Sequence, residues 1–203
     1  DWSSDVCSSD LKRWGVYSHK VVDPNHPLVA GVNTRFNIPH SRFNEISRRQ
    51  FEQGRLGILA ESEEAGVHLA VSEDGFRIVF FQGHPEYDAI SLLKEYKREV
   101  GRFIHGELSE YPPLPEHYFS PRSMAILEEY REWVLAARTS GRESPGFPED
   151  LIVPTLDNTW HDSAEAIINN WIGKVYQITD IDRRRPFRQG IDPANPLGWK
   201  RRD

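Results

Sequence analysis

The sequence predicts an α/β domain, and two kinds of segment support that prediction. Three short segments rich in apolar residues, 56–60, 67–72 and 76–81, follow one another closely and have the pattern of β-strands. Two longer segments, 88–106 and 163–176, repeat their apolar residues every three or four positions, as amphipathic helices do. Strands and helices that alternate along one chain are typical of a sheet covered by helices.

The remaining elements follow from the same patterns. Residues 14–22 contain alternating apolar positions and predict another strand, and 46–53 and 124–138 predict helices. Residues 23–43 contain three prolines, so we expect mainly loop there. The Glu-Asp-Gly sequence at 73–75 predicts a hairpin turn between the second and third short strands.

The composition excludes several classes of protein. The chain has 203 residues, of which 38% are hydrophobic, and its formal net charge is −6. This acidic balance offers no basic surface for nucleic acid, and no apolar run is long enough to cross a bilayer. We therefore expect neither nucleic acid nor a membrane as a partner. The single cysteine excludes a disulfide framework and indicates a reducing compartment, so we expect a cytoplasmic protein.

The first ten residues, DWSSDVCSSD, differ from the rest of the chain. Seven of them are Ser or Asp, and they show neither helical nor strand periodicity. The string resembles a translated sequencing adapter, so we expect residues 1–11 to be a foreign leader, followed by a domain at 12–181 and a charged, poorly packed tail at 182–203. Cys7 lies near two aspartates and lacks the electropositive setting that activates a thiol, so we do not propose it as a nucleophile.

One short motif combines residues suited to acid–base chemistry. Gly83-His84-Pro85-Glu86 stands directly after the third short strand, and catalytic groups in open α/β sheets gather where strands end. A bend at Pro85 can bring the Glu86 carboxylate to the imidazole of His84. A carboxylate on one ring nitrogen fixes the tautomer and leaves the other nitrogen to act as a base. The alternative is a loop histidine beside an incidental acid.

Longer blocks around this motif resemble a known family. The block FFQGHPEYDAISLLKEYKREV looks like the region around the catalytic His and Glu of the homoserine O-succinyltransferases, and KRWGVYSH, NIPHSRF and TWHDSAEAIINNWIGKVYQIT match at corresponding spacing. The resemblance covers most of residues 12–180. It implies a class I glutamine-amidotransferase-like (flavodoxin-like) fold, a three-layer α/β sandwich that is incomplete in this chain.

The resemblance also implies roles for five residues. His84 would be the general base and Glu86 its orienting partner. Lys12 matches a substrate-binding lysine, Ser41 a serine that contacts substrate, and Arg98 a substrate-binding arginine. An arginine fork suits the α-carboxylate of homoserine. Without the resemblance, Lys12 and Arg98 would be interpreted as ordinary solvated surface residues, and Ser41 as a turn or capping serine.

The family's chemistry implies the partners of the reaction. A cysteine thiolate would attack succinyl-CoA or acetyl-CoA, and the acyl group would pass to the γ-hydroxyl of L-homoserine in methionine biosynthesis. Acyl-CoA is then a co-substrate, and we expect no other cofactor, no metal and a homodimer. We expect the nucleophile to lie N-terminal to residue 12, so that the chain by itself is inactive.

Two other functions remain open at this stage. A class I glutamine amidotransferase domain uses the same three catalytic residue types, Cys, His and Glu. We would not expect the NIPHSRF and NNWIGKVYQIT blocks in such a domain. A non-catalytic binding domain of the same fold is the second alternative. Residues 122–150 differ from the family, since many relatives have a shorter loop there, and we interpret them as a helical insertion.

Overall fold

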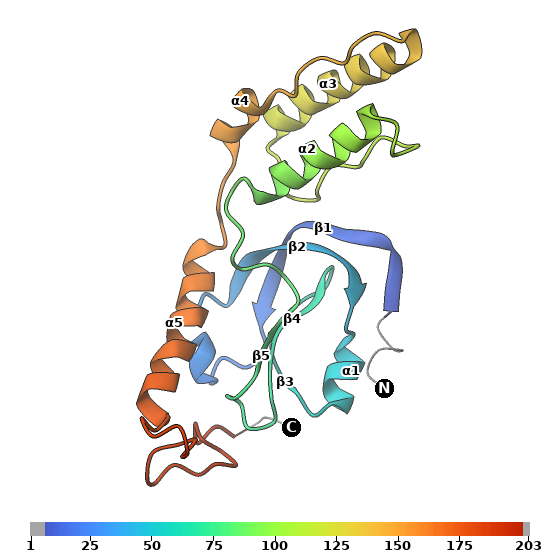
Figure 1. Ribbon diagram of the computed structural model, residues 1–203. Coiled ribbons are helices and arrows are strands. Elements are labelled where there is room, and N and C mark those ends of the chain that lie inside the picture. The colour runs from blue at the N-terminus through green and yellow to red at the C-terminus, as the bar shows by residue number, and fades with distance from the viewer. Residues whose placement is uncertain (1–6, 201–203) are drawn as a thin grey trace. The chain divides into compact units, whose positions relative to one another are not determined.

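The computed structural model describes the backbone of residues 7–200 and the side chains of residues 12–200. The chain forms two compact units (Figure 1). The first contains residues 1–13, 17–86 and 159–203, and the second contains residues 14–16 and 87–158.

The first unit is built on a curled five-stranded sheet (Figure 1). Its strand order is β2-β1-β3-β4-β5, and β3 pairs antiparallel with both β1 and β4, as β4 does with β5. A sheet flanked by helices confirms the predicted α/β class and fits the incomplete sandwich expected from the sequence. The strands are β1 (Cys7–Val21), β2 (Arg35–Glu45), β3 (Gly57–Ser62), β4 (Gly66–Val71) and β5 (Val79–Phe81).

Strand β2 lies where the sequence predicted mainly loop, and that prediction was wrong. Pro39 stands inside this strand. A proline cannot donate a hydrogen bond to a sheet, but it is tolerated at an edge, and β2 is an edge strand of the described sheet. The proline therefore marks an edge strand here rather than a break.

Strand β5 is shorter than predicted because an aspartate holds the residues before it. The Asp74 carboxylate accepts hydrogen bonds from the backbone N–H groups of Phe76 (2.9 Å) and Arg77 (3.0 Å). Those groups are therefore used in the turn, and the strand begins only at Val79. The predicted hairpin is confirmed, since Val71 pairs with Val79 across it.

Strand β1 begins at Cys7, earlier than the strand expected at 14–22. Residues 1–6 of the expected leader, and the side chain of Cys7, lie outside the described residues. The foreign origin of residues 1–11 stays a prediction.

The helices of the first unit are set by clear capping and anchoring contacts. A capping box between Ser47 and Gln50 begins α1 (Arg48–Gln53). Helix α5 (His161–Ile178) is tied to the short helix η1 (Pro27–Val29), because the side-chain amide of Asn170 donates to the carbonyl oxygens of Leu28 (3.0 Å) and Ala30 (2.8 Å).

The second unit is helical. Helix α2 (Ser91–Ile104) starts three residues later than the helix expected at 88–106. Helix α3 (Pro121–Ser140) is longer than predicted, because Ser120 caps its start and Gly141 ends it in a left-handed conformation with φ of 64°. The two short helices that follow are α4 (Glu149–Ile152) and η2 (Val153–Thr155).

Most of the tail beyond residue 182 is exposed, as the sequence predicted, but two of its aromatic residues pack against the rest of the first unit. Phe187 is buried in a cluster with Phe76 and Ile178. The indole N–H of Trp199 donates to the Asp23 carboxylate (3.0 Å), and its ring lies against Gly57. Two aromatic residues thus anchor a segment whose charge and prolines suggested little packing.

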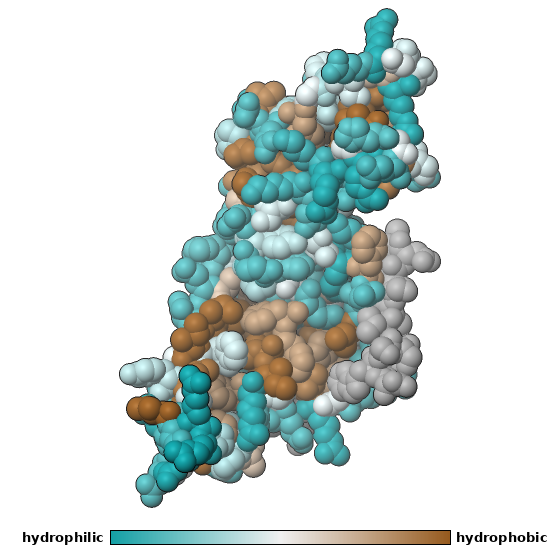
Figure 2. Space-filling view, viewed as in Figure 1, coloured by the Kyte–Doolittle hydropathy of each residue, from teal (hydrophilic) through white to brown (hydrophobic). Residues whose placement is uncertain are grey.

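One face of the first unit retains accessible apolar side chains. Figure 2 shows hydrophobic residues gathered over the sheet, in the region of β3 to β5. Ile58 and Phe80 pack there on a buried cluster while remaining partly exposed, and Ile78 is 54% exposed. Among the described helices, none combines the length and hydropathy needed to span a membrane.

Candidate active site

The candidate site is the turn that follows β5, and Gln82 fixes where this turn starts. Its side-chain amide donates to the carbonyl oxygens of Ile46 (2.9 Å) and Val67 (2.7 Å), and its amide oxygen accepts from the N–H of Ile46 (2.7 Å). Three hydrogen bonds to two different segments hold one short side chain in place. Sequence analysis did not single out Gln82, because these partners lie 15 and 36 residues away.

The next two residues are held by their backbone. The N–H of Gly83 donates to Nδ1 of His68 (3.3 Å), and the N–H of His84 donates to the carbonyl oxygen of Pro39 (2.8 Å). Gly83 is required for this approach. A Cβ at position 83 would lie 2.5 Å from a methyl carbon of Ile38 and 2.7 Å from Nε2 of His40.

The structure brings His84 and Glu86 into direct contact. Nδ1 of His84 lies 2.9 Å from Oε1 of Glu86, with side chains 34% and 66% exposed. An ionised carboxylate only accepts hydrogen bonds, so the imidazole Nδ1–H donates to it. Neutral His84 therefore carries its lone pair on Nε2, which is the nitrogen that a general base uses. The contact expected from the sequence is present.

The three predicted substrate-binding residues lie on different elements. Ser41 is on β2, two residues beyond Pro39, so its strand is hydrogen-bonded to the turn at His84. Lys12 is on β1, the neighbour of β2 in the sheet. Arg98 is 64% exposed on α2 in the second unit, where its Nε lies 3.4 Å from the carboxylate of Glu99. Their roles stay predictions.

Sequence analysis missed a group of buried imidazoles behind the turn. His19, His40 and His68, here called the histidine cluster, are each fully buried, on β1, β2 and β4. The rings of His19 and His40 stack with centroids 5.1 Å apart, and His68 lies 5.2 Å from His19 and 6.0 Å from His40. Polar residues at inward-facing strand positions were the available signal, as with His68 between Val67 and Leu69.

Burial lowers the pKa of every member of the cluster. Desolvation lowers the pKa of His19 to about 4, although a hydrogen bond to the Tyr17 carbonyl partly opposes it. Desolvation also dominates for His40 and His68, and repulsion from His19 lowers both pKa values further. All three imidazoles are therefore neutral near pH 7.

Together these groups can accept a proton at an accessible position. Nε2 of His84 is the nitrogen that can accept it, because Nδ1 is hydrogen-bonded to Glu86, and the neutral cluster beneath adds no charge of its own. Residues 12–203 contain no cysteine, so this part of the chain offers no thiol nucleophile.

Comparison with known proteins places the chain in a family. The model of a family described as homoserine O-succinyltransferase matches residues 6–181. Curated relatives of that name include one from Thioalkalivibrio nitratireducens, 68% identical over 190 residues, and one from Nitrosococcus oceani, 67% identical over 190 residues. Each match covers 94% of this chain and 53% of the relative, so the chain spans about half the length of the curated relatives it matches.

A solved glutamine amidotransferase from Thermotoga maritima is similar at 16% identity, with a TM-score of 0.35, over 66% of this chain and 52% of that one. The family model, in contrast, extends over most of this chain and includes the turn with His84 and Glu86. The chain therefore belongs to the homoserine O-succinyltransferase family.

Proposed function

We propose that the protein transfers a succinyl group from succinyl-CoA to the γ-hydroxyl of L-homoserine, with His84 as the general base. The observation that carries this proposal is the 2.9 Å contact between Nδ1 of His84 and Glu86. It fixes the lone pair on Nε2, where a substrate hydroxyl can be deprotonated. Family membership and the names of the curated relatives supply the substrates.

The proposed reaction has two half-reactions. A cysteine thiolate from outside residues 12–203 attacks the thioester carbon of succinyl-CoA, and CoA leaves as the thiolate. Nε2 of His84 then takes the proton of the homoserine hydroxyl. The hydroxyl oxygen attacks the acyl carbon, the bond from that carbon to the cysteine sulfur breaks, and the cysteine leaves as a thiolate. O-succinylhomoserine, an intermediate for methionine synthesis, is released, and His84 gives up its proton through solvent to the CoA thiolate, which regenerates the neutral base. Acetyl-CoA is the alternative donor.

Three residues are proposed to bind substrate in this scheme. The guanidinium of Arg98 is suited to the α-carboxylate of homoserine because its fork matches a carboxylate bidentately. Ser41 and Lys12 lie on adjacent strands of the sheet, and Ser41 belongs to the strand that is hydrogen-bonded to the turn. We also propose a cytoplasmic homodimer that needs no cofactor besides acyl-CoA.

A chimaera tests this function. The 190 matching residues of this chain replace their counterpart in the Thioalkalivibrio nitratireducens relative, so that the relative supplies the rest of the protein. We expect transfer from succinyl-CoA to homoserine, measured as O-succinylhomoserine formed and as CoA thiol released beyond the single equivalent of the first half-reaction. The 203-residue chain by itself is expected to show no turnover.

Two outcomes would contradict the proposal. The first is a folded chimaera that hydrolyses glutamine and does not acylate homoserine, and the second is a folded chimaera with neither activity. Acetyl-CoA in place of succinyl-CoA identifies the donor in the same assay. If the chimaera does not fold by circular dichroism, the histidine corresponding to His84 is replaced in the relative itself, and unchanged transfer there would be equally decisive.

A further inference from the structure

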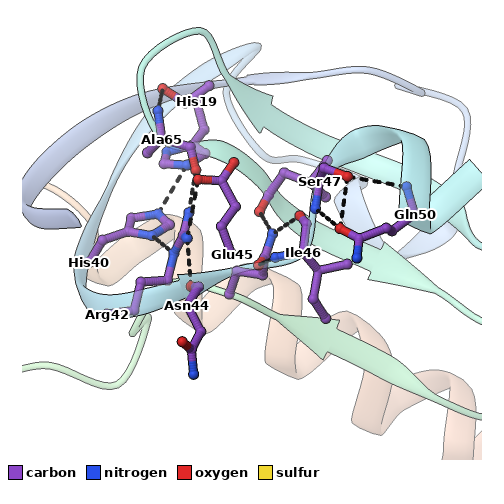
Figure 3. A network of polar contacts seen from close by, with 12 residues as sticks. His19, His40, Arg42, Asn44, Glu45, Ile46, Ser47, Gln50 and Ala65 are labelled. Atoms are coloured by element: carbon purple, nitrogen blue, oxygen red, sulfur yellow. Dashed lines mark hydrogen bonds and ion pairs between the residues drawn. The ribbon is translucent and has the colours of Figure 1, made fainter. Parts of the chain in front are cut away.

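The histidine cluster contains a series of hydrogen bonds whose direction is fixed at its start. The guanidinium Nε of Arg42 always donates, and it lies 3.2 Å from Nδ1 of His40 (Figure 3). His40 must therefore accept at Nδ1 and carry its proton on Nε2. That nitrogen lies 3.2 Å from Nε2 of His19, which must accept, so His19 carries its proton on Nδ1. Nδ1 of His19 donates to the carbonyl oxygen of Tyr17 at 2.9 Å.

The position of the Arg42 guanidinium is itself fixed by further contacts. Its Nη2 donates to the carbonyl oxygen of Ala65 (2.6 Å) and its Nη1 to that of Asn44 (2.8 Å), as Figure 3 shows. Nη1 also lies 3.5 Å from the Glu45 carboxylate. The donor groups of Arg42 thus have defined acceptors, and one tautomer follows for each of His40 and His19.

The third member of the cluster is fixed in the same way by the turn. The Gly83 N–H is a donor, so His68 accepts at Nδ1 and carries its proton on Nε2. Among the described residues, that buried Nε2 has no hydrogen-bond partner. A buried N–H without an acceptor lowers the stability of the fold, and an apolar side chain at position 68 would avoid this loss. The need to fill a buried position therefore does not by itself explain a histidine there. Its one hydrogen bond goes to the residue before His84.

The cluster also touches the catalytic turn directly. Nε2 and Cε1 of His40 lie 2.7 Å and 3.0 Å from the position where a Cβ of Gly83 would be. The carbonyl of Pro39, the residue before His40, accepts the N–H of His84 at 2.8 Å. The ring of His40 therefore lies directly against Gly83, so a displaced ring would press on the backbone that leads to His84.

We propose that His40 is a positioning residue for His84, acting through a series of tautomer-locked neutral imidazoles with His19 and His68 that holds the Gly83–His84 backbone in place. This inference rests on the proposed role of His84 as base. His40 does not touch substrate in this account. It sets where Nε2 of His84 lies, and a displacement of about 1 Å in a catalytic group can cost about 100-fold in rate.

The test compares two substitutions at one position. His40→Phe keeps a ring beneath Gly83 but removes both hydrogen bonds of the series, whereas His40→Gln keeps a donor near Nε2. In the chimaera described above, we expect His40→Phe to lower kcat at least about tenfold with the KM for homoserine unchanged, and His40→Gln to recover most of that loss. His26→Gln is the matched control, because His26 is equally buried but bonds to Leu28 and Gly75 instead. It should leave kcat unchanged.

A second readout does not depend on activity. Amide hydrogen exchange of Gly83 and His84 in the 203-residue chain should quicken at least about tenfold in His40→Phe relative to His26→Gln, after correction for global stability. If the unsubstituted chimaera is inactive, the proposed function fails, and the exchange data still decide the positioning role.

Two results would overturn the inference: a folded His40→Phe protein with normal kcat, or one in which exchange at Gly83 and His84 is no faster than in the control. If His40→Phe does not fold, the pair His68→Leu and His68→Asn carries the same test, because Asn retains an acceptor for the Gly83 N–H and Leu does not. Equal kcat and equal exchange in that pair would also contradict the proposal.

Discussion

Replacing His84 with alanine is expected to lower kcat of the chimaeric transferase by about 10²- to 10⁴-fold, the range typical for loss of a general base. The proton of the homoserine hydroxyl then has no acceptor in the transition state. The side chain is 34% exposed and its hydrogen bond is to Glu86 at the surface, so the folded state should be retained. Steady-state rates with succinyl-CoA and homoserine measure the effect.

The pattern of kinetic constants separates this role from others. Because the base acts in the transition state, kcat and kcat/KM should fall together. The control is His105→Ala, which removes another imidazole at the end of α2 and should leave both constants unchanged. A His84→Ala chimaera that retains kcat within about threefold would remove His84 from the mechanism.

The second large effect is loss of stability in mild acid. Four fully buried histidines have lowered pKa values: the three of the histidine cluster and His26, whose pKa falls to about 4, chiefly through desolvation. As the pH falls through 6.5, the unfolded chain binds a proton on each of them and the folded chain does not. Stability is therefore complete above pH 6.5 and is lost below it.

The size of this effect follows from proton linkage. Between about pH 7.5 and about pH 5.5, each of these histidines should remove about 1.4 kcal/mol from the free energy of unfolding, and the four together about 5 kcal/mol. That is comparable with the whole stability of many domains. Urea unfolding of the 203-residue chain at the two pH values measures it.

Substitutions show whether the histidines are the source. His26→Gln should reduce the difference between the two pH values by about a quarter, whereas Phe51→Leu, which removes buried ring volume without a titrating group, should lower stability equally at both. A chain whose free energy of unfolding is the same at both pH values would show that these imidazoles are not buried and neutral in the folded state.

The sequence predicted best what depends on neighbours along the chain. The contact between His84 and Glu86 joins residues two apart, so it could be expected from the motif alone. The hairpin before it and the helix at 163–176 follow local patterns in the same way. The caps at Ser120 and Gly141 are also local signals, and they explain why α3 extends beyond the predicted 124–138.

What the sequence did not predict depends on distant partners. The proline in β2 suggested a loop, because only the sheet order shows that this strand lies at an edge. His19 and His40 are 21 residues apart and meet through strand pairing, which periodicity does not reveal. Trp199 contacts Asp23 across 176 residues, so this anchor of the tail could not be recognised from local composition.

We expect Glu86 to keep the proton of neutral His84 on Nδ1 and thereby to leave Nε2 as the base. Long-range nitrogen–proton NMR spectra of the nitrogen-labelled chain, recorded where the ring is neutral, report this tautomer directly. We predict the Nδ1–H form for His84, and a shift towards the Nε2–H form in Glu86→Leu, which removes the acceptor. An Nε2–H tautomer in the unsubstituted chain, or a tautomer that Glu86→Leu leaves unchanged, would contradict the account.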